Sequence, residues 1–176
     1  TIGSDDLSGL GGDDRIFGDK YGDNLDGGAG ADFVDGGAGG DAIFGGGSSD
    51  VLKGAGGNDV IKAGTGKDSV FGGAGNDTLF GGSGDDTLTG GVGDDEIFGG
   101  GDNDVIVFAA GHGDDSVGGF ESLGDNTLDL SAIGLTGMGD LNISQSGSDV
   151  LIDTTEGTIT LWNTEVSDIT ASDFIF

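Results

Sequence analysis

A nine-residue period governs residues 1–108 of this chain, which has 176 residues in all. Counted from Thr1 in steps of nine, the fifth residue of each unit is always aspartate: Asp5, Asp14, Asp23, Asp32, Asp41, Asp50, Asp59, Asp68, Asp77, Asp86, Asp95 and Asp104. Two residues further on stands a large aliphatic side chain: Leu7, Ile16, Leu25, Val34, Ile43, Leu52, Ile61, Val70, Leu79, Leu88, Ile97 and Ile106. A few matches would arise by chance in an aspartate-rich chain, but an unbroken series at two positions would not.

The period excludes an α-helix and predicts turns that alternate with short strands. Nine residues make about 2.5 helical turns, so successive aliphatic residues would lie on opposite faces of a helix. Each unit instead predicts a six-residue turn, whose glycines supply positive φ angles, and a three-residue strand such as 78–80. Two units form an 18-residue coil with one strand in each of two facing sheets. The fold expected for residues 1–108 is an all-β parallel β-roll, a solenoid whose coils stack about 4.8 Å apart.

Residues 109–176 form a second expected unit, because the period ends after Phe108. Apolar residues alternate with polar ones at 126–130, 141–145 and 158–162, and a short apolar run at 150–152 also predicts a strand. Turn residues at 146–148 and 154–157 predict hairpins, and short helical turns are expected at 131–133 and 165–169. These patterns predict a small antiparallel β cap that closes the open end of the roll, where strand edges would otherwise invite aggregation.

The composition predicts that the chain needs a cation in order to fold. Glycine makes up 43 of 176 residues, and 33 acidic residues against 5 basic ones give a net charge of −28. Glycine has the largest backbone entropy to lose on folding, and a self-repelling chain with few large apolar residues stays disordered unless something else stabilises it. The same charge argues against binding to nucleic acid. No apolar run approaches the roughly 20 residues of a membrane span.

The type of cation follows from the available ligands. The chain has no cysteine and one histidine, His112, which excludes thiolate sites and multi-histidine zinc or iron centres. Carboxylate and carbonyl oxygens suit Ca²⁺, which takes six to eight oxygen ligands, better than Mg²⁺. Turns one coil apart share an edge of the roll, which pairs the aspartates as Asp5/Asp23, Asp14/Asp32, Asp23/Asp41, Asp32/Asp50, Asp41/Asp59, Asp50/Asp68, Asp59/Asp77, Asp68/Asp86, Asp77/Asp95 and Asp86/Asp104. Ten sandwiched Ca²⁺ ions, the maximum, would reduce the charge to about −8.

The repeats resemble those of the RTX (repeats-in-toxin) calcium-binding family. The loops that end at Asp32, Asp41, Asp77, Asp86 and Asp95 match Gly-Gly-x-Gly-x-Asp in full. Others depart at single positions, and the loop before Asp23 has Asp19-Lys20-Tyr21-Gly22 in place of the glycine core, which argues against a standard site there. The resemblance implies a right-handed parallel β-roll. It also implies that each ion is held by the loop aspartate and two backbone carbonyls from each of two loops.

Carried over to this chain, the resemblance assigns the metal ligands to the twelve aspartates and to the first four positions of the loops. These loop residues are Gly9, Gly11, Gly27, Gly28, Ala29, Gly30, Gly36, Gly37, Ala38, Gly39, Gly45, Gly46, Gly47, Gly54, Ala55, Gly56, Gly57, Ala63, Gly64, Thr65, Gly66, Gly72, Gly73, Ala74, Gly75, Gly81, Gly82, Ser83, Gly84, Gly90, Gly91, Val92, Gly93, Gly99 and Gly101.

The C-terminal region resembles that of RTX exoproteins such as serralysin-type proteases and alginate epimerases. The terminal Asp173-Phe174-Ile175-Phe176 is similar to the signal read by type I (ABC) secretion machines. The resemblance implies a secreted, extracellular bacterial protein, with a further domain N-terminal to this chain. The expected function is a non-catalytic module that is disordered without Ca²⁺, folds after export and stabilises the protein to which it belongs.

Two alternatives belong to other classes of function. One is a glycan-binding accessory module, as in alginate epimerases, or an adhesin segment. The other is an enzyme. The sequence argues against this alternative, because it contains no nucleophile–base constellation, no catalytic zinc ligand set and no phosphate-binding loop.

Four further features each allow a functional and a structural interpretation. Phe44, Lys62, Phe80 and Phe98 lie in line on one sheet face, where cross-strand stacking is favoured over a docking strip. His112 is expected to be a loop residue instead of a ligand or base, and Trp162 part of the cap core instead of a sugar platform. Isolated lysines are expected to relieve charge locally instead of holding an anionic glycan: Lys53, Lys62 and Lys67.

Overall fold

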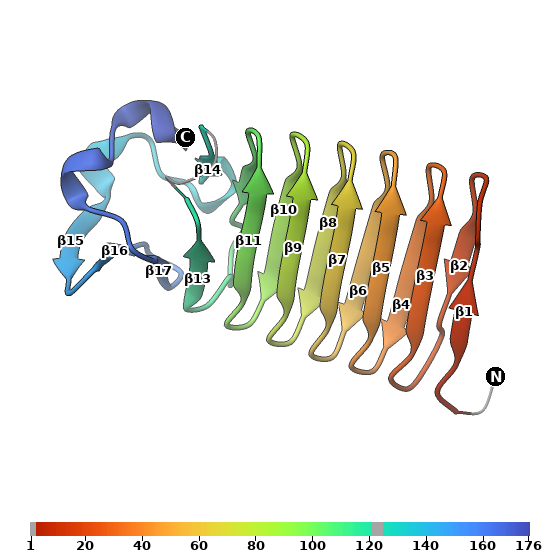
Figure 1. Ribbon diagram of the computed structural model, residues 1–176. Helices are drawn as coiled ribbons and strands as arrows, with labels where there is room; N and C mark the ends of the chain where they lie inside the picture. Colours follow the sequence, from red (N-terminus) through yellow and green to blue (C-terminus); the bar gives the residue numbers. More distant parts are fainter. Residues whose placement is uncertain (1–2, 121–124) are drawn as a thin grey trace.

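The computed structural model describes residues 3–120 and 125–176, which form a two-sheet parallel β-solenoid with an antiparallel cap at one end (Figure 1). The first sheet contains, in spatial order, β1 (Asp6–Ser8), β3 (Asn24–Ala29), β5 (Ala42–Gly47), β7 (Val60–Thr65), β9 (Thr78–Ser83), β11 (Glu96–Gly101), β13 (Asp115–Gly118), β17 (Thr158–Leu161), β16 (Asp149–Asp153) and β15 (Asn142–Ser146). The second contains β18 (Phe174–Ile175), β14 (Thr127–Asp129), β12 (Val105–Val107), β10 (Thr87–Val92), β8 (Ser69–Ala74), β6 (Val51–Gly56), β4 (Phe33–Ala38) and β2 (Arg15–Phe17).

The strands of the repeats pair in parallel, so that each residue lies beside its counterpart two nonapeptides later. Strand β7 pairs with β9 so that Ile61 lies beside Leu79 and Lys62 beside Phe80, and the other neighbours within the repeats follow the same offset. Successive strands alternate between the two sheets, so two nonapeptides make one coil (Figure 1). The predicted parallel β-roll, with two repeats in each coil, is confirmed.

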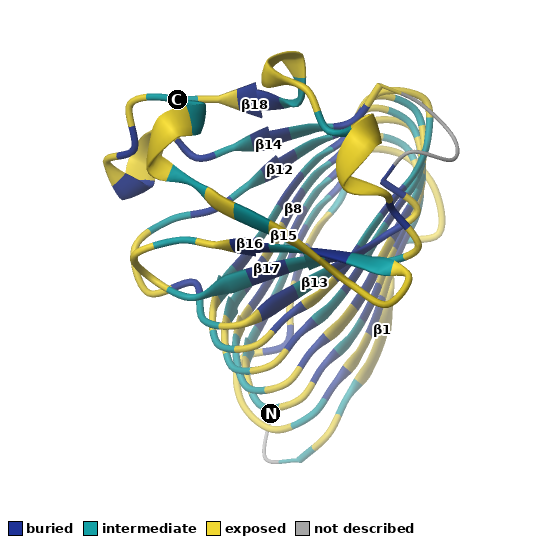
Figure 2. Ribbon diagram, turned by 90° about the vertical axis from the view of Figure 1, so that its left-hand side faces the viewer, coloured by how far each residue is buried: buried dark blue, intermediate teal, exposed yellow. Residues whose placement is uncertain are grey.

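The aliphatic residues of the repeats form a single row of buried side chains between the sheets. Eleven of the twelve, from Ile16 to Ile106, are buried, as the dark stripes along the strands in Figure 2 show. Leu7 is 36% exposed because it belongs to the outermost coil of the described residues. Burying one such side chain contributes about 1.5–3 kcal/mol, so a narrow core of this kind needs many coils.

The strands within the roll are longer than predicted. Strands β3 to β11 each have six residues, because the first three loop residues stay extended and pair with the next coil. In β9 the pairing resumes at Gly82 after skipping Gly81, whose Cα lies on the buried side of the strand. Only the segment 84–86 then makes the turn. The prediction of three-residue strands holds for β1, β2 and β12 alone among the repeats.

The roll continues past the last repeat, beyond the expected boundary at Phe108. Strand β13 pairs in parallel with β11, and β14 pairs in parallel with β12, but the paired residues lie further apart in sequence than in the repeats: Glu96 pairs with Ser116, and Val105 with Thr127. Strand β17 also pairs in parallel with β13, and β18 with β14. The predicted antiparallel cap is present as β15, β16 and β17. It covers one more coil, formed by β13 and β14 and called the closing coil below, which the period did not reveal.

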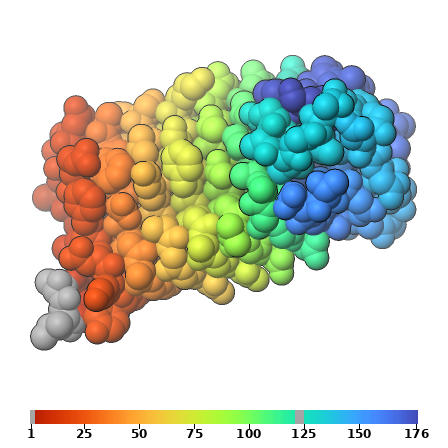
Figure 3. Space-filling view, turned by 180° about the vertical axis from the view of Figure 1, so that it is seen from behind, coloured from red at the N-terminus to blue at the C-terminus, as the bar shows by residue number. Residues whose placement is uncertain are grey.

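Four short 3₁₀ helices connect the strands of the cap, and two of them fall where helical turns were predicted. They are η1 (Ser131–Ile133), η2 (Met138–Asp140), η3 (Val166–Asp168) and η4 (Ala171–Asp173). Figure 3 shows the cap as a rounded mass at the C-terminal end of an elongated roll. Within residues 3–120 and 125–176, no helix has the length and apolarity needed to cross a bilayer.

An aromatic ladder runs along the outer face of the first sheet and reaches the cap. The rings of Phe80 and Phe98 stack with centroids 4.9 Å apart, and Phe98 lies 5.7 Å from Trp162. Lys62 Nζ lies 5.9 Å from the Phe44 ring and 5.6 Å from the Phe80 ring. The favoured interpretation, cross-strand stacking, is confirmed, whereas Trp162 lies half-buried against the roll and not inside the cap core.

Candidate metal centre

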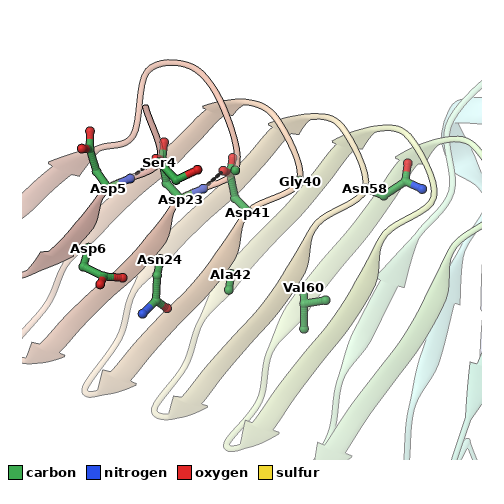
Figure 4. A pocket seen from close by; sticks show the side chains of 11 residues that line it. Ser4, Asp5, Asp6, Asp23, Asn24, Gly40, Asp41, Ala42, Asn58 and Val60 are labelled. Carbon is green, nitrogen blue, oxygen red and sulfur yellow. Dashed lines mark hydrogen bonds between the residues drawn. The ribbon is translucent and has the colours of Figure 1, made fainter. Parts of the chain in front are cut away.

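The loop aspartates form two columns, one along each edge of the roll. Figure 4 shows Asp5, Asp23 and Asp41 on successive coils. The first column contains Asp5, Asp23, Asp41, Asp59, Asp77 and Asp95, and the second contains Asp14, Asp32, Asp50, Asp68, Asp86 and Asp104. Ten of these side chains are 1–4% exposed, and those of the outermost coil, Asp5 and Asp14, are half-buried. The structure therefore brings together all ten pairs that the sequence predicted.

From Asp23 to Asp104, one carboxylate oxygen of each aspartate accepts a hydrogen bond from the backbone of the preceding coil. The N–H group of Asp59 donates to Oδ1 of Asp77 at 2.8 Å, and the N–H group of Asp50 donates to Oδ1 of Asp68 at 2.8 Å. The same bond recurs throughout both columns at 2.6–3.0 Å. These bonds fix each carboxylate in the edge of the roll and order its second oxygen.

The second oxygen of these carboxylates is buried and unpaired. Oδ2 has no hydrogen-bond partner among the described residues in Asp14, Asp23, Asp32, Asp41, Asp50, Asp59, Asp68, Asp77, Asp86, Asp95 and Asp104. A buried acceptor without a partner is costly, and a buried charge more so. A feature repeated eleven times along two columns indicates sites whose partner is a cation.

The first loop position places a carbonyl oxygen beside this unpaired oxygen. An ideal Cβ on Gly27 would lie 2.6 Å from Oδ2 of Asp32 and 2.7 Å from the carbonyl oxygen of Gly45, one coil further on. The same two kinds of oxygen meet beside Gly9, Gly18, Gly36, Gly45, Gly54, Gly72 and Gly81. A carboxylate oxygen without a hydrogen-bond partner and a carbonyl oxygen that approach the same point make a donor set for a hard cation such as Ca²⁺.

The second and fourth loop positions direct their carbonyl oxygens toward the following coil. A Cβ on Gly84, where φ is +116°, would overlap the carbonyl oxygen of Gly66, and most residues at these positions are glycines with φ between 98° and 143°. Where another residue replaces glycine, φ falls to 71–88° and the loop keeps its course; these residues are Leu10, Asp19, Tyr21, Ser48, Ala55 and Asp102. Imperfect repeats therefore also direct these carbonyl oxygens toward the following coil.

The loop before Asp23 illustrates this tolerance. Despite its Asp19-Lys20-Tyr21-Gly22 core, Asp23 has the same Oδ1 bond, at 2.6 Å from the Asp5 nitrogen, and the same unpaired Oδ2 as its neighbours. Gly18, which was not among the predicted ligands, lies beside Asp23 Oδ2 and the Gly36 carbonyl oxygen. The backbone of this loop follows that of the standard loops, because Asp19 and Tyr21 adopt positive φ angles in place of glycine. Whether the loop holds a metal stays a prediction.

Burial of these carboxylates favours their neutral form when no cation is beside them. Desolvation raises the pKa of Asp50 and Asp59 to about 6, and that of Asp86 and Asp95 to about 7, with the neighbouring carboxylates adding to the increase. The backbone hydrogen bond to Oδ1 opposes the shift in each case. Within the described ranges there is no cluster of three or more His, Cys, Asp or Glu side chains that could hold a metal. An ion in these columns would depend on carboxylate pairs supplemented by main-chain carbonyls.

Two residues beyond the repeats take the place of the next aspartate in each column. Asp95 N–H donates to Oδ1 of Asp115 at 2.9 Å, and Asp104 N–H donates to Oδ1 of Asn126 at 2.9 Å. The nine-residue frame missed both because the connections are longer by two and four residues. The available signal was the aliphatic residue two places after each, Val117 and Leu128.

His112 lies in the loop between β12 and β13, as predicted, but it is buried in the closing coil. It is 1% exposed, its ring meets Phe108 edge-on at 5.3 Å, and Nδ1 lies 2.9 Å from Oδ2 of Asp115. Its Nε2 lies 2.9 Å from Oγ1 of Thr154. No sequence pattern indicates this hydroxyl–imidazole–carboxylate line. Thr154 Oγ1 also lies within hydrogen-bond distance of the N–H groups of Glu156 and Gly157 and of the Gly157 carbonyl oxygen.

Comparison with known proteins agrees with the repeat pattern. The family model described as the RTX calcium-binding nonapeptide repeat (four copies) matches residues 1–20, 8–43, 17–52, 44–79, 53–88, 71–106 and 80–115. No curated protein matches the chain.

The solved structures found to be similar have low sequence identity to this chain. The solution structure of the R3 subunit of the mannuronan C5-epimerase AlgE6 from Azotobacter vinelandii is 23% identical, with a TM-score of 0.56 over 72% of this chain and 78% of that chain. The R2 subunit of the same epimerase is 25% identical, with a TM-score of 0.43 over 76% and 91%. The extracellular lipase LipA from Serratia marcescens is 19% identical, with a TM-score of 0.45 over 94% of this chain and 38% of that chain.

Proposed function

Because the chain belongs to the RTX calcium-binding nonapeptide repeat family, we propose that it is a calcium-dependent folding module of a secreted protein. Ca²⁺ ions would be held between coils by the Oδ2 atoms of the two columns and by carbonyl oxygens of the first, second and fourth loop positions. The observation that carries the proposal is the row of buried, unpaired Oδ2 atoms. When bound, Ca²⁺ supplies positive charge between carboxylates that would otherwise repel one another.

Calcium binding and folding would be a single event in this module. The donors of one site come from two loops on successive coils, such as those that end at Asp59 and Asp77, and they meet only when the coils stack. The binding free energy is then folding free energy. Extracellular calcium modules commonly have dissociation constants of about 10⁻⁴–10⁻³ M, so the chain would remain unfolded at cytosolic calcium levels and fold outside the cell.

The position of the C-terminus supports export before folding. Phe174 is buried in β18, which pairs with β14, and the Phe176 ring lies 5.8 Å from that of Phe174. A type I secretion machine that reads this segment would need it unpaired, which the calcium-free chain provides. Folding outside would then sequester the signal and stabilise whatever protein the module belongs to, without a catalytic role of its own.

Far-UV circular dichroism of the calcium-free and calcium-loaded protein tests this function. We expect the β-sheet signal to be absent after chelation and to return cooperatively at millimolar Ca²⁺, but not at the same concentration of Mg²⁺. An unchanged β-sheet signal after complete removal of calcium would contradict the proposal.

A second candidate function is glycan binding, and one observation favours it. The aromatic ladder on the first sheet interleaves Lys62 between Phe44 and Phe80, and Phe44 is 38% exposed. Aromatic faces with a cation are suited to an acidic polysaccharide, and the similar R3 subunit belongs to an enzyme named for mannuronan. Calorimetric titration of the calcium-loaded protein with mannuronan and with neutral glycans tests this candidate. An absence of heat with every glycan would leave the folding module as the function.

A further inference from the structure

We propose that the closing coil ends both calcium columns by replacing the metal with side-chain hydrogen bonds. In this proposal His112 closes the first column at Asp115, and Asn126 closes the second. We call the space between two successive residues of a column an interval. Neither the interval Asp95/Asp115 nor the interval Asp104/Asn126 holds Ca²⁺. The inference rests on the proposed calcium binding by the repeats. It goes further because it assigns specific residues to the termination of each column.

The first column ends where its last carboxylate acquires a protein partner. Asp115 continues the ladder, since its Oδ1 accepts from Asp95 N–H in the same way as in every earlier pair. Its Oδ2 differs, because His112 Nδ1 lies 2.9 Å away, whereas Oδ2 of the repeat aspartates in both columns from Asp14 to Asp104 is unpaired among the described residues. Because an ionised carboxylate can only accept, the Nδ1–H tautomer of the imidazole donates to the atom that the repeats leave for a cation.

The imidazole is held in this position by two contacts and by burial. Thr154 Oγ1 lies 2.9 Å from Nε2, the Phe108 ring contacts the imidazole edge-on, and both His112 and Asp115 are at most 2% exposed. Thr154 belongs to the turn between β16 and β17, so the antiparallel cap itself supports the histidine. The His112–Asp115 pair is therefore part of the protein interior and not a surface contact.

The second column ends by a different chemical route with the same result. Asn126 supplies Oδ1 to Asp104 N–H, but its second terminal atom is an amide nitrogen, which donates to the Phe120 carbonyl oxygen at 3.0 Å. An amide N–H₂ group is a donor and cannot ligate a cation. The last residue of each column thus keeps the Oδ1 atom that accepts the backbone N–H, but it has no Oδ2 atom available to a cation.

The carbonyl donors also change at the end of the first column. Beside the first glycine of eight earlier loops, a carbonyl oxygen from the following coil is among the three nearest atoms to an ideal Cβ. At Gly90 the three nearest atoms all belong to Asp95. No carbonyl oxygen of the following coil therefore comes nearer than 2.9 Å to this position, whereas beside seven of the eight earlier glycines it lies at 2.4–2.7 Å. This difference weakens the donor set between Asp95 and Asp115 a second time.

Calcium stoichiometry and calcium linkage test the proposal in the full chain. Native mass spectrometry counts the bound ions, and the slope of unfolding free energy against log[Ca²⁺] reports the ions released on unfolding, because each ion that binds only the folded state adds to that slope. We expect at most ten ions in the wild type. Asp115→Asn, which converts the end of the first column to the chemistry of the second, should change neither the count nor the slope.

The matched control is Asp77→Asn, which makes the same chemical change inside the first column and should lower both quantities. His112→Ala should lower the unfolding midpoint, because it leaves Asp115 Oδ2 buried without a donor, but it should leave the slope at the wild-type value. A loss of ions or of slope in Asp115→Asn, or more than ten ions in the wild type, would overturn the proposal. A wild-type slope of zero would instead refute calcium binding by the repeats, on which the proposal rests, and would remove both.

Discussion

The repeated coils and the closing coil share the hydrogen bond from a backbone N–H to Oδ1, but they differ in the second terminal atom of the same side chain. In both, a backbone N–H donates to the Oδ1 atom of the residue one coil later, whether the two residues are 18, 20 or 22 positions apart. From Asp14 to Asp104 the companion Oδ2 is buried and has no partner among the described residues. In the closing coil Asp115 Oδ2 is paired with His112, and Asn126 has no such oxygen. The difference separates the backbone requirement for stacking from the chemical requirement for a cation.

This comparison shows that stacking alone does not identify a metal site. A carboxylate that only had to order the edge of the roll would need one oxygen, as asparagine at position 126 demonstrates. The repeats have aspartate at all twelve positions, and with it a charge that burial penalises. This uniform use of aspartate is explained if the second oxygen has a cationic partner.

The largest expected effect comes from removing a single Oδ2 in the middle of a column. Asp59→Asn keeps the Oδ1 acceptor but removes a ligand from two intervals, so calcium affinity measured by titration should fall by at least about tenfold, the lower end of what changes around metal ligands cost. Asp95→Asn, which borders one calcium interval, should have a smaller effect, and Asp115→Asn should have none.

The control for this series is Asp26→Asn, which makes the same change on the exposed outer face of β3. Equal losses of affinity in Asp26→Asn and Asp59→Asn would mean that general charge, and not the columns, determines binding.

A second expected effect is that calcium-free protein gains stability in mild acid. Desolvation raises the pKa of Asp86 and Asp95 to about 7 in the folded state, above the ordinary value of an unfolded aspartate. The folded state therefore binds more protons, so its stability is greatest below about pH 4 and is lost as pH rises through about 7.

Circular dichroism in calcium-depleted buffer should consequently show β structure increasing as pH falls from 8 toward 5. With saturating Ca²⁺ the pH dependence should weaken or reverse, because protons then compete with the metal for the same oxygens. A calcium-free chain that lost structure on acidification would contradict the burial of these carboxylates.

The smallest expected effect concerns the junction between the roll and the cap. Phe98→Leu removes a ring that contacts both Phe80 and Trp162, which should cost about 0.5–1.5 kcal/mol of unfolding free energy at saturating Ca²⁺. The matched control is Phe71→Leu on the second sheet, where the ring is 39% exposed and contacts Lys53 at 6.0 Å. Urea denaturation of both variants should show the larger loss for Phe98→Leu; equal losses would mean that the ladder adds nothing beyond burial.

Much of the roll could be predicted from the sequence because its order is local and periodic. The spacing of Asp77 and Leu79, which recurs in every unit, determines both the inward row and the edge columns, and it predicts the pairing of strands two repeats apart directly. The extension of each strand into its loop was not predictable from glycine content, since the same residues that permit a turn also permit an extended chain. The pairing of the next coil decides between them.

The closing coil lay beyond the reach of a periodic argument. Insertions of two and four residues move Asp115 and Asn126 out of frame, and the His112–Asp115–Thr154 line joins residues up to 42 positions apart. Contacts of this kind depend on how the cap folds back on the roll, which the nine-residue period does not encode. The unpaired Oδ2 row was likewise inaccessible, because the sequence predicts which carboxylates meet but not which oxygen each uses.

A crystal structure of the calcium-loaded protein, with anomalous scattering used to locate the metal, tests the central claim most directly. We predict two lines of Ca²⁺ ions, each ion about 2.3–2.6 Å from an aspartate Oδ2 atom, running between successive coils and ending at Asp77/Asp95 and Asp86/Asp104. Folded coils whose Oδ2 atoms contact no divalent ion at saturating calcium would contradict the claim.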